Sequence, residues 1–135
     1  MRNTAFKVLL LEDEDVDELI VRKLLEKATF NSYLLHHKNC RDALRCLKSL
    51  NTDTFPDLVM VDILLTGASG FVFLEEYGKL YSQLHPDTLV IVLSSSLNRA
   101  YKDKALSYPF VTHYWVKPLT RARVKQLKPA WIKQE

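Results

Sequence analysis

The stretch VLLLEDEDVDEL, residues 8–19, runs from four aliphatic residues directly into four carboxylates. An apolar run without polar alternation is typical of a strand that is buried on both faces. The acidic residues that follow predict a polar site at the end of this strand, beginning with Glu12 and Asp13. The spacing of the apolar residues after them predicts a helix.

The composition is that of one compact domain. The chain has 135 residues, of which 47% are hydrophobic, enough for a single sizeable core. Its 19 basic and 16 acidic residues leave a net charge of +3, too mild to indicate nucleic acid binding by itself. We expect one domain over residues 1–135, with a core at about 5–128 and a C-terminal tail at 129–135, because Pro129 interrupts the last helical stretch.

No segment of the sequence has the length and apolar character of a membrane span, and the first apolar run is too short for a signal peptide. We therefore expect a cytoplasmic protein without membrane association. A disulfide is not expected either, because the two cysteines lie six residues apart in one predicted helix and face different sides of it.

Five short apolar runs along the chain each predict a strand: FKVLLL, YLLHH, DLVMVD, TLVIVLS and FVTHYWV. The segments between them have helical spacing, which predicts apolar faces made of Val16, Leu19, Ile20 and Leu24, and of Ala43, Leu44, Leu47 and Leu50. Strand then helix, five times over, predicts an α/β fold with a parallel sheet covered by helices on both faces.

Three helix starts carry capping signals. Asp15 with Glu18 resembles a capping box, and Ser69 precedes the helical segment FVFLEEY. Thr120 follows Pro118 and is the predicted N-cap of the last helix.

Polar residues follow four of the five predicted strands. Ligands of open parallel α/β sheets bind beyond the carboxyl ends of the strands, so these side chains are expected to share one rim. They are Glu12 and Asp13 after the first strand, Asp62 after the third, Ser94 and Ser95 after the fourth, and Lys117 after the fifth.

The chemistry of this rim points to a metal ion and a phosphoryl group. Two carboxylates about 4 Å apart repel each other by roughly 1 kcal/mol in water and about 4 kcal/mol near a protein surface, so three together favour a bound cation. Oxygen ligands without histidine or cysteine suit Mg²⁺. A hydroxyl and a lysine that lie opposite this metal site can bind phosphoryl oxygens. The rim therefore indicates phosphoryl chemistry on a carboxylate.

Four motifs in order resemble those of response regulator receiver domains, and the resemblance spans nearly the whole chain. VLLLEDED resembles the first strand with its acidic pair, FPDLVMVDILLTGASGF the phosphoacceptor strand and loop, VIVLSSS the strand with the switch hydroxyl, and YWVKPLT the strand with the lysine and proline. The resemblance implies a flavodoxin-like, doubly wound (βα)5 fold with a five-stranded parallel sheet in the order 2-1-3-4-5.

The resemblance also implies a role for individual residues. Asp62 would accept a phosphoryl group from a sensor histidine kinase, and Lys117 would pair first with Asp62 and then with a phosphoryl oxygen. Ser94 would move inward to bond the phosphoryl oxygen, and Tyr114 would follow into the vacated space.

The implied cofactor is Mg²⁺, bound by Asp13, Asp62 and the backbone carbonyl of Leu64, with Glu12 acting directly or through a metal-bound water. A cis peptide bond is expected between Lys117 and the proline after it.

Such a domain is not an enzyme on other substrates, because it catalyses only its own phosphorylation and slow dephosphorylation. Its implied partners are a sensor histidine kinase or phosphotransfer protein, and a downstream protein that binds the surface of the fourth helix, fifth strand and fifth helix. A phosphorylation-dependent homodimer and a role as a phosphorelay intermediate both stay open. The basic segment RARVKQLKP lacks aromatic interleaving, so direct nucleic acid binding is not expected.

The sequence departs from the family pattern in three places. Thr66 stands where proline is common, Ser94 where threonine is commoner, and Cys40 where glycine is usual. None of these departures removes a catalytic group.

A second family offers an alternative. Asp13 and Asp15 fit the opening motif of haloacid-dehalogenase-like phosphatases, in which Asp13 would be the nucleophile and Asp15 a general acid. Those enzymes need an acidic pair after the lysine to bind Mg²⁺. Here no acidic residue follows Lys117 until Glu135, the chain is short for that fold, and Asp62 would have no role.

Overall fold

The computed structural model describes residues 5–28 and 31–133. Its elements, in chain order, are β1 (Phe6–Leu11), α1 (Asp15–Glu26), β2 (Ser32–His37), α2 (Cys40–Ser49), β3 (Leu58–Val61), β4 (Leu64–Leu65), β5 (Ala68–Ser69), α3 (Gly70–Leu80), β6 (Leu89–Ser94), α4 (Arg99–Ser107), β7 (Val111–Val116), α5 (Arg121–Lys125) and α6 (Lys128–Lys133).

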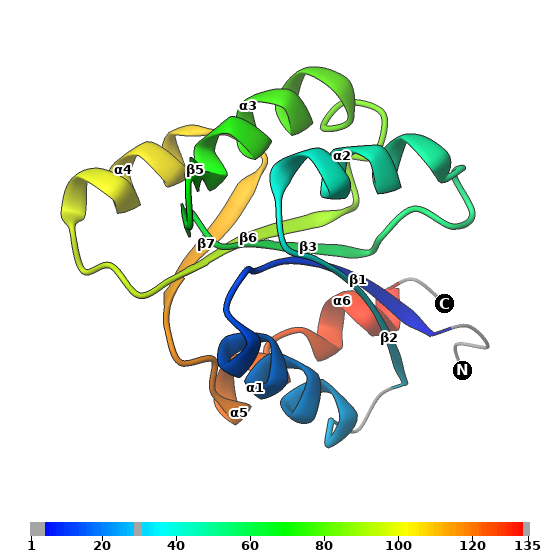
Figure 1. Ribbon diagram of the computed structural model, residues 1–135. Coiled ribbons are helices and arrows are strands. Elements are labelled where there is room, and N and C mark those ends of the chain that lie inside the picture. The colour runs from blue at the N-terminus through cyan, green and yellow to red at the C-terminus, as the bar shows by residue number, and fades with distance from the viewer. Residues whose placement is uncertain (1–4, 29–30, 134–135) are drawn as a thin grey trace.

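The five long strands form one parallel sheet in the order β2-β1-β3-β6-β7. Counting only these strands, the order is 2-1-3-4-5, which confirms the predicted fold class. Helices α2, α3 and α4 cover one face of the sheet, and α1, α5 and α6 cover the other (Figure 1). The carboxyl ends of all five strands point in the same direction, which is what brings distant polar residues to one rim.

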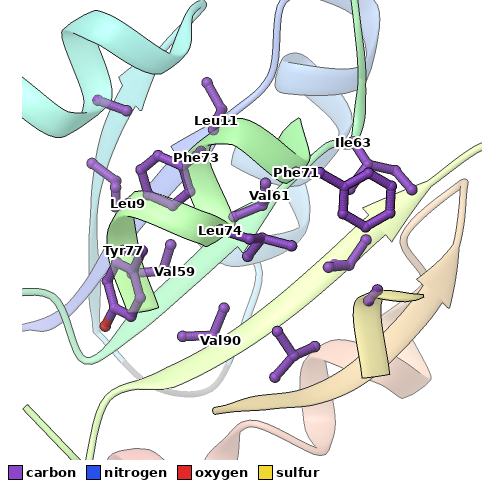
Figure 2. Close-up of a cluster of buried hydrophobic side chains, with 14 of the residues drawn as sticks. Leu9, Leu11, Val59, Val61, Ile63, Phe71, Phe73, Leu74, Tyr77 and Val90 are labelled. Atoms are coloured by element: carbon purple, nitrogen blue, oxygen red, sulfur yellow. The ribbon is translucent and has the colours of Figure 1, made fainter. Parts of the chain in front are cut away.

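Alternate residues of the central strands pack into two separate hydrophobic cores, one on each face of the sheet. Leu9, Val59 and Val90 pack beneath Phe73 and other residues of α3, as Figure 2 shows. The other face carries Val8, Leu10, Met60 and Ile91, which pack with Val21 and Leu25 of α1 and with Trp115, Val124 and Leu127. Each fully buried aliphatic or aromatic side chain contributes roughly 1.5–3 kcal/mol of hydrophobic stabilisation. The three central strands are therefore fixed from both sides.

The prediction that all five strands are buried on both faces was wrong for the two edge strands. Residues of β2 are mostly half-buried, and Tyr33 is 56% exposed. In β7 the side chains of Thr112, His113 and Val116 are exposed. An edge strand has a neighbour on one side only, so apolar content alone does not ensure that it is covered.

The predicted apolar face of the first helix was also partly wrong. Val16 is 69% exposed and Leu19 is 51% exposed, whereas Val21 and Leu25 are buried. The predicted capping box at Asp15 is absent, because Asp15 is the first helical residue and Glu14 occupies the N-cap position without a side-chain bond. The other two caps are confirmed, since the Ser69 and Thr120 hydroxyl oxygens accept hydrogen bonds from backbone amides at the starts of α3 and α5.

A short hairpin and a final helix were not predicted as separate elements. The two-residue strands β4 and β5 pair antiparallel around Gly67, whose φ of 73° favours glycine. Near the C-terminus, α5 ends at Lys125, and Pro129 lies in the first turn of α6, where its missing amide proton is not needed. Residues 134 and 135 of the predicted tail lie outside the described residues. Within the described ranges, no helix is long and apolar enough to cross a membrane.

Candidate functional site

The ends of four strands bring polar side chains to one rim of the sheet. Glu12 follows β1, Asp62 follows β3, Ser94 ends β6, and Lys117 follows β7. Glu12, Asp62 and Ser94 are at most 3% exposed, although each is polar. Buried polar groups of this kind require partners, and the structure supplies most of them within the rim itself.

Three carboxylates converge within this rim. Glu12, Asp13 and Asp62 each present an oxygen atom, and these atoms lie within 4.8 Å of one another. Asp13 Oδ2 accepts a hydrogen bond of 2.5 Å from the Thr66 amide, and Asp62 Oδ1 accepts one of 2.9 Å from the Leu64 amide.

One buried oxygen of this acidic cluster has neither a hydrogen bond nor an ion pair among the described residues, whereas the buried Glu12 Oε1 lies 2.6 Å from Lys117 Nζ. Asp13 Oδ1 has no hydrogen bond to any described residue. A buried carboxylate oxygen without a partner, next to two further carboxylates, is suited to bind a cation. Because every candidate ligand is an oxygen, the site fits a hard ion such as Mg²⁺ or Mn²⁺.

Lys117 neutralises part of the negative charge. Its Nζ lies 2.6 Å from Glu12 Oε1, 2.8 Å from Asp17 Oδ2 and 3.0 Å from Asp62 Oδ2, and its side chain is only 9% exposed. Burial opposes the charged form, but hydrogen bonds to the three carboxylates outweigh it and raise the pKa of Lys117 above its ordinary value. The lysine is therefore charged at neutral pH.

The position of Lys117 is set by its backbone as well. Its amide donates a 2.8 Å hydrogen bond to the carbonyl of Ser94 at the end of the neighbouring strand. The bond between Lys117 and Pro118 is cis, as predicted.

Glu12 and Asp13 respond differently to their surroundings. Burial raises the pKa of Glu12 from 4.5 to about 7; Lys117 opposes this shift and Asp62 adds to it. Burial also acts to raise the pKa of Asp13, but hydrogen bonds from Thr66 outweigh it, and the net shift is downward. Asp13 is therefore ionised at neutral pH, whereas Glu12 is close to its midpoint. A single ammonium faces an excess of carboxylates, which again favours a bound cation.

The two predicted switch residues are linked through Ser96. The Ser94 hydroxyl oxygen accepts a 3.1 Å hydrogen bond from the Ser96 amide, and the Tyr114 hydroxyl donates a 2.8 Å bond to the Ser96 carbonyl. Both side chains thus bind the same residue of the loop between β6 and α4. A rearrangement at Ser94 would disturb the partner of Tyr114.

The structure thus brings together Glu12, Asp13, Asp62 and Lys117, with Ser94 on the adjoining strand. Leu64 joins them through its amide, whereas metal binding by its carbonyl stays a prediction. Asp15, the general acid of the phosphatase alternative, pairs instead with Lys38 and has a side chain that is 81% exposed, which does not favour that alternative.

Asp17 was not among the residues that the sequence predicted for the rim. It binds Lys117 from the first turn of α1. Its place four residues after Asp13, in the first turn of a helix that starts at the rim, is the signal that could have identified it.

Comparisons with known proteins bear on the fold. No protein-family model and no curated protein matches the sequence. Among solved structures, the chain is similar to a two-component response regulator from Cytophaga hutchinsonii, with 22% identity, a TM-score of 0.84, and coverage of 94% of this chain and 96% of that one.

Two further solved structures resemble it over similar lengths. The Mn²⁺-bound form of response regulator Rcp1 is 20% identical, with a TM-score of 0.75 and 96% of each chain covered. The phosphorylated cyanobacterial phytochrome response regulator RcpA is 23% identical, with a TM-score of 0.74 and coverage of 98% of this chain and 97% of that one. The sheet order, the helices on both faces and these likenesses together show that the chain has the receiver-domain fold of response regulators.

Proposed function

We propose that this protein is a phosphoaccepting receiver domain in which Asp62 takes a phosphoryl group from a phosphohistidine on a sensor histidine kinase or phosphotransfer protein. One observation carries the proposal: Asp62 lies buried where the strand ends converge, between the acidic pair and Lys117. An aspartate that only capped the end of a strand would need neither the acidic pair nor Lys117 beside it.

The metal of this proposal is Mg²⁺, held by Asp13 and Asp62, with the Leu64 carbonyl and Glu12 as further ligands. The Asp13 oxygen that lacks a hydrogen-bond partner supports this assignment. So does the similarity to response regulator Rcp1, whose solved form contains Mn²⁺. When bound, the ion offsets negative charge on the carboxylates and on the incoming phosphoryl group.

In the transfer step, an Asp62 carboxylate oxygen forms a bond to phosphorus while the bond between phosphorus and the donor's imidazole nitrogen breaks. The electron pair of that bond stays with the ring nitrogen, and a proton on the other ring nitrogen, already present or taken up from solvent, leaves the imidazole neutral. The Leu64 amide and the Lys117 ammonium hold the Asp62 carboxylate in place. Positioning and charge compensation are the main demands of this chemistry.

The signal depends on Ser94 and Tyr114. To donate a hydrogen bond to a phosphoryl oxygen, the Ser94 hydroxyl must turn toward Asp62, which weakens its bond to the Ser96 amide. Tyr114, which binds the Ser96 carbonyl, then loses the geometry of its present contact. The two arrangements differ at the surface of α4, β7 and α5, where a downstream protein would bind.

Exposed apolar side chains on this surface support a partner there. Leu106 of α4 and Val116 of β7 are each 41% exposed, and Leu97, in the loop before α4, is 84% exposed. Such side chains suit a protein partner better than a nucleic acid.

The decisive experiment is an intact-mass measurement after incubation with acetyl phosphate and MgCl₂. The wild-type protein should gain one phosphoryl mass. Asp62→Asn, and wild type with excess chelator, should gain none. A label that persists in Asp62→Asn but disappears in Asp13→Asn would support the phosphatase alternative. The absence of any label under these conditions would refute the proposal.

A further inference from the structure

Asp17 is the third carboxylate on Lys117, and the proposed chemistry gives it no role. Its Oδ2 lies 2.8 Å from Lys117 Nζ, across a separation of 100 residues in the sequence. It is absent from the group of acidic residues whose oxygens converge as a candidate metal site. Asp17 therefore contacts the site through the lysine.

Lys117 Nζ donates hydrogen bonds to Asp17 and Asp62 and forms an ion pair with Glu12. An ammonium has three N–H bonds, and three carboxylates lie between 2.6 and 3.0 Å from Nζ. Two of them, Glu12 and Asp62, belong to the acidic cluster whose charge changes when a cation or a phosphoryl group arrives. Among the described residues, Asp17 is the one carboxylate partner of Lys117 outside that cluster.

The location of Asp17 suits it to this contact. It lies in the first turn of α1, a helix anchored by buried Val21 and Leu25. Its side chain is 30% exposed, against 9% for the Lys117 side chain. A helix-borne carboxylate thus holds the ammonium from the solvent side, while the buried carboxylates hold it from inside.

We propose that Asp17 is a positioning residue for phosphoryl transfer, which keeps the Lys117 ammonium at the site when the free Asp62 carboxylate becomes an acyl phosphate. This inference rests on the proposed function of Asp62. Without Asp17, the lysine would depend on two groups whose charges are partly taken up by a cation and by the incoming phosphoryl group. Its ammonium would then sample other positions, and fewer encounters with a phosphoryl donor would be productive.

Two variants separate the hydrogen bond from the charge. Asp17→Asn keeps an oxygen that can accept from Lys117, whereas Asp17→Ala removes it. Asp15→Ala is the matched control, because Asp15 is also an acidic residue of the first turn but pairs with Lys38 on the surface. The rate of phosphorylation is followed by intact mass over a range of acetyl phosphate concentrations with saturating MgCl₂.

The loss of one charge-assisted hydrogen bond predicts that Asp17→Ala lowers the maximal rate by about tenfold or more. The acetyl phosphate concentration at half-maximal rate should change little. Asp17→Asn should recover to within about threefold of wild type, and Asp15→Ala should match wild type. An Asp17→Ala variant that is phosphorylated as fast as wild type, or faster, would overturn the inference.

A second measurement does not depend on phosphorylation. Proton and nitrogen NMR of the lysine side chains should show a slowly exchanging Lys117 ammonium in wild type and in Asp17→Asn, but a signal lost to exchange in Asp17→Ala. If the wild type takes up no phosphoryl group, the proposed function fails, and this spectrum alone decides whether Asp17 positions the lysine. An ammonium signal that is unchanged in Asp17→Ala would reject that role.

Discussion

Replacing Glu12 by glutamine tests the electrostatics of the rim. The Glu12 carboxylate is fully buried, and its pKa rises from 4.5 to about 7. The folded protein therefore binds this proton more tightly than the unfolded chain does. Stability should fall as the pH rises from about 4.5 to about 7, because the unfolded state releases the proton first. At one pKa unit per roughly 1.4 kcal/mol, the ionised carboxylate destabilises the metal-free fold by about 3 kcal/mol at pH 8.

The glutamine side chain removes this charge but keeps an oxygen that can accept from Lys117. It loses one contact, because an amide nitrogen cannot accept the 3.2 Å hydrogen bond that the Glu14 amide now donates to Glu12 Oε2. That loss is worth about 1 kcal/mol. In chelator at pH 8, Glu12→Gln should therefore be more stable than wild type by about 2 kcal/mol. At pH 4.5 this advantage should disappear.

Saturating Mg²⁺ should narrow the difference in stability at pH 8. A ligand present at 100 times its dissociation constant stabilises the folded state by about 2.7 kcal/mol, and a variant that lacks one candidate ligand should gain less. Mg²⁺ should also bind wild type more tightly as the pH rises through about 7, because ionised Glu12 is the better ligand.

The assay is urea unfolding, followed by far-ultraviolet circular dichroism at pH 4.5, 6 and 8, with EDTA or with MgCl₂. Glu26→Gln is the control, because its side chain is 57% exposed and should change stability by less than about 0.5 kcal/mol. The reasoning fails if wild-type stability in EDTA is constant or increases from pH 4.5 to 8 while Glu12→Gln is no more stable at pH 8.

Substitutions at three further positions, two near the rim and one at the opposite ends of the strands, test how the backbone is held, each by urea unfolding. A Cβ at Gly70 would lie 2.2 Å from the Asp62 carbonyl oxygen, so Gly70→Ala should lose about 3 kcal/mol. At Gly67 a Cβ would contact nothing, but the φ of +73° is unfavourable for alanine, so Gly67→Ala should lower the free energy of unfolding by only about 1 kcal/mol. Equal losses for Gly67→Ala and Gly70→Ala would contradict this reasoning. Asp57→Ala removes the oxygen that accepts the 2.8 Å bond from the Lys7 amide and should lose about 1–3 kcal/mol, most of which Asp57→Asn should restore. If both Asp57 variants lose the same amount, the carboxylate rather than the hydrogen bond is what matters.

Local patterns along the chain were sufficient to predict the sheet and most of the rim. A parallel sheet places all strand ends at one edge, so a polar residue that follows an apolar run can be assigned there without coordinates. This reasoning placed Glu12, Asp62, Ser94 and Lys117 together, and the structure confirms their convergence. Apolar content also identified the three central strands correctly, because strands with neighbours on both sides are covered on both faces.

The same patterns failed where burial depends on what packs against an element. The edge strands β2 and β7 have the apolar content of central strands but are partly exposed, and Val16 and Leu19 lie on the outer side of α1. Hydrophobic spacing defines which residues share a helix face, but the angle at which the helix docks on the sheet decides which part of that face is covered.

The sequence by itself determined the strand order, through the resemblance of its motifs, and the acidic, hydroxyl and lysine residues of the rim. Only the tertiary structure decided how those residues share their bonds. The contact between Asp17 and Lys117 joins residues 100 positions apart. The Ser96 backbone joins Ser94 to Tyr114 across two strands. Such contacts depend on how closely groups of different elements approach one another in the folded chain, and no local periodicity encodes that approach.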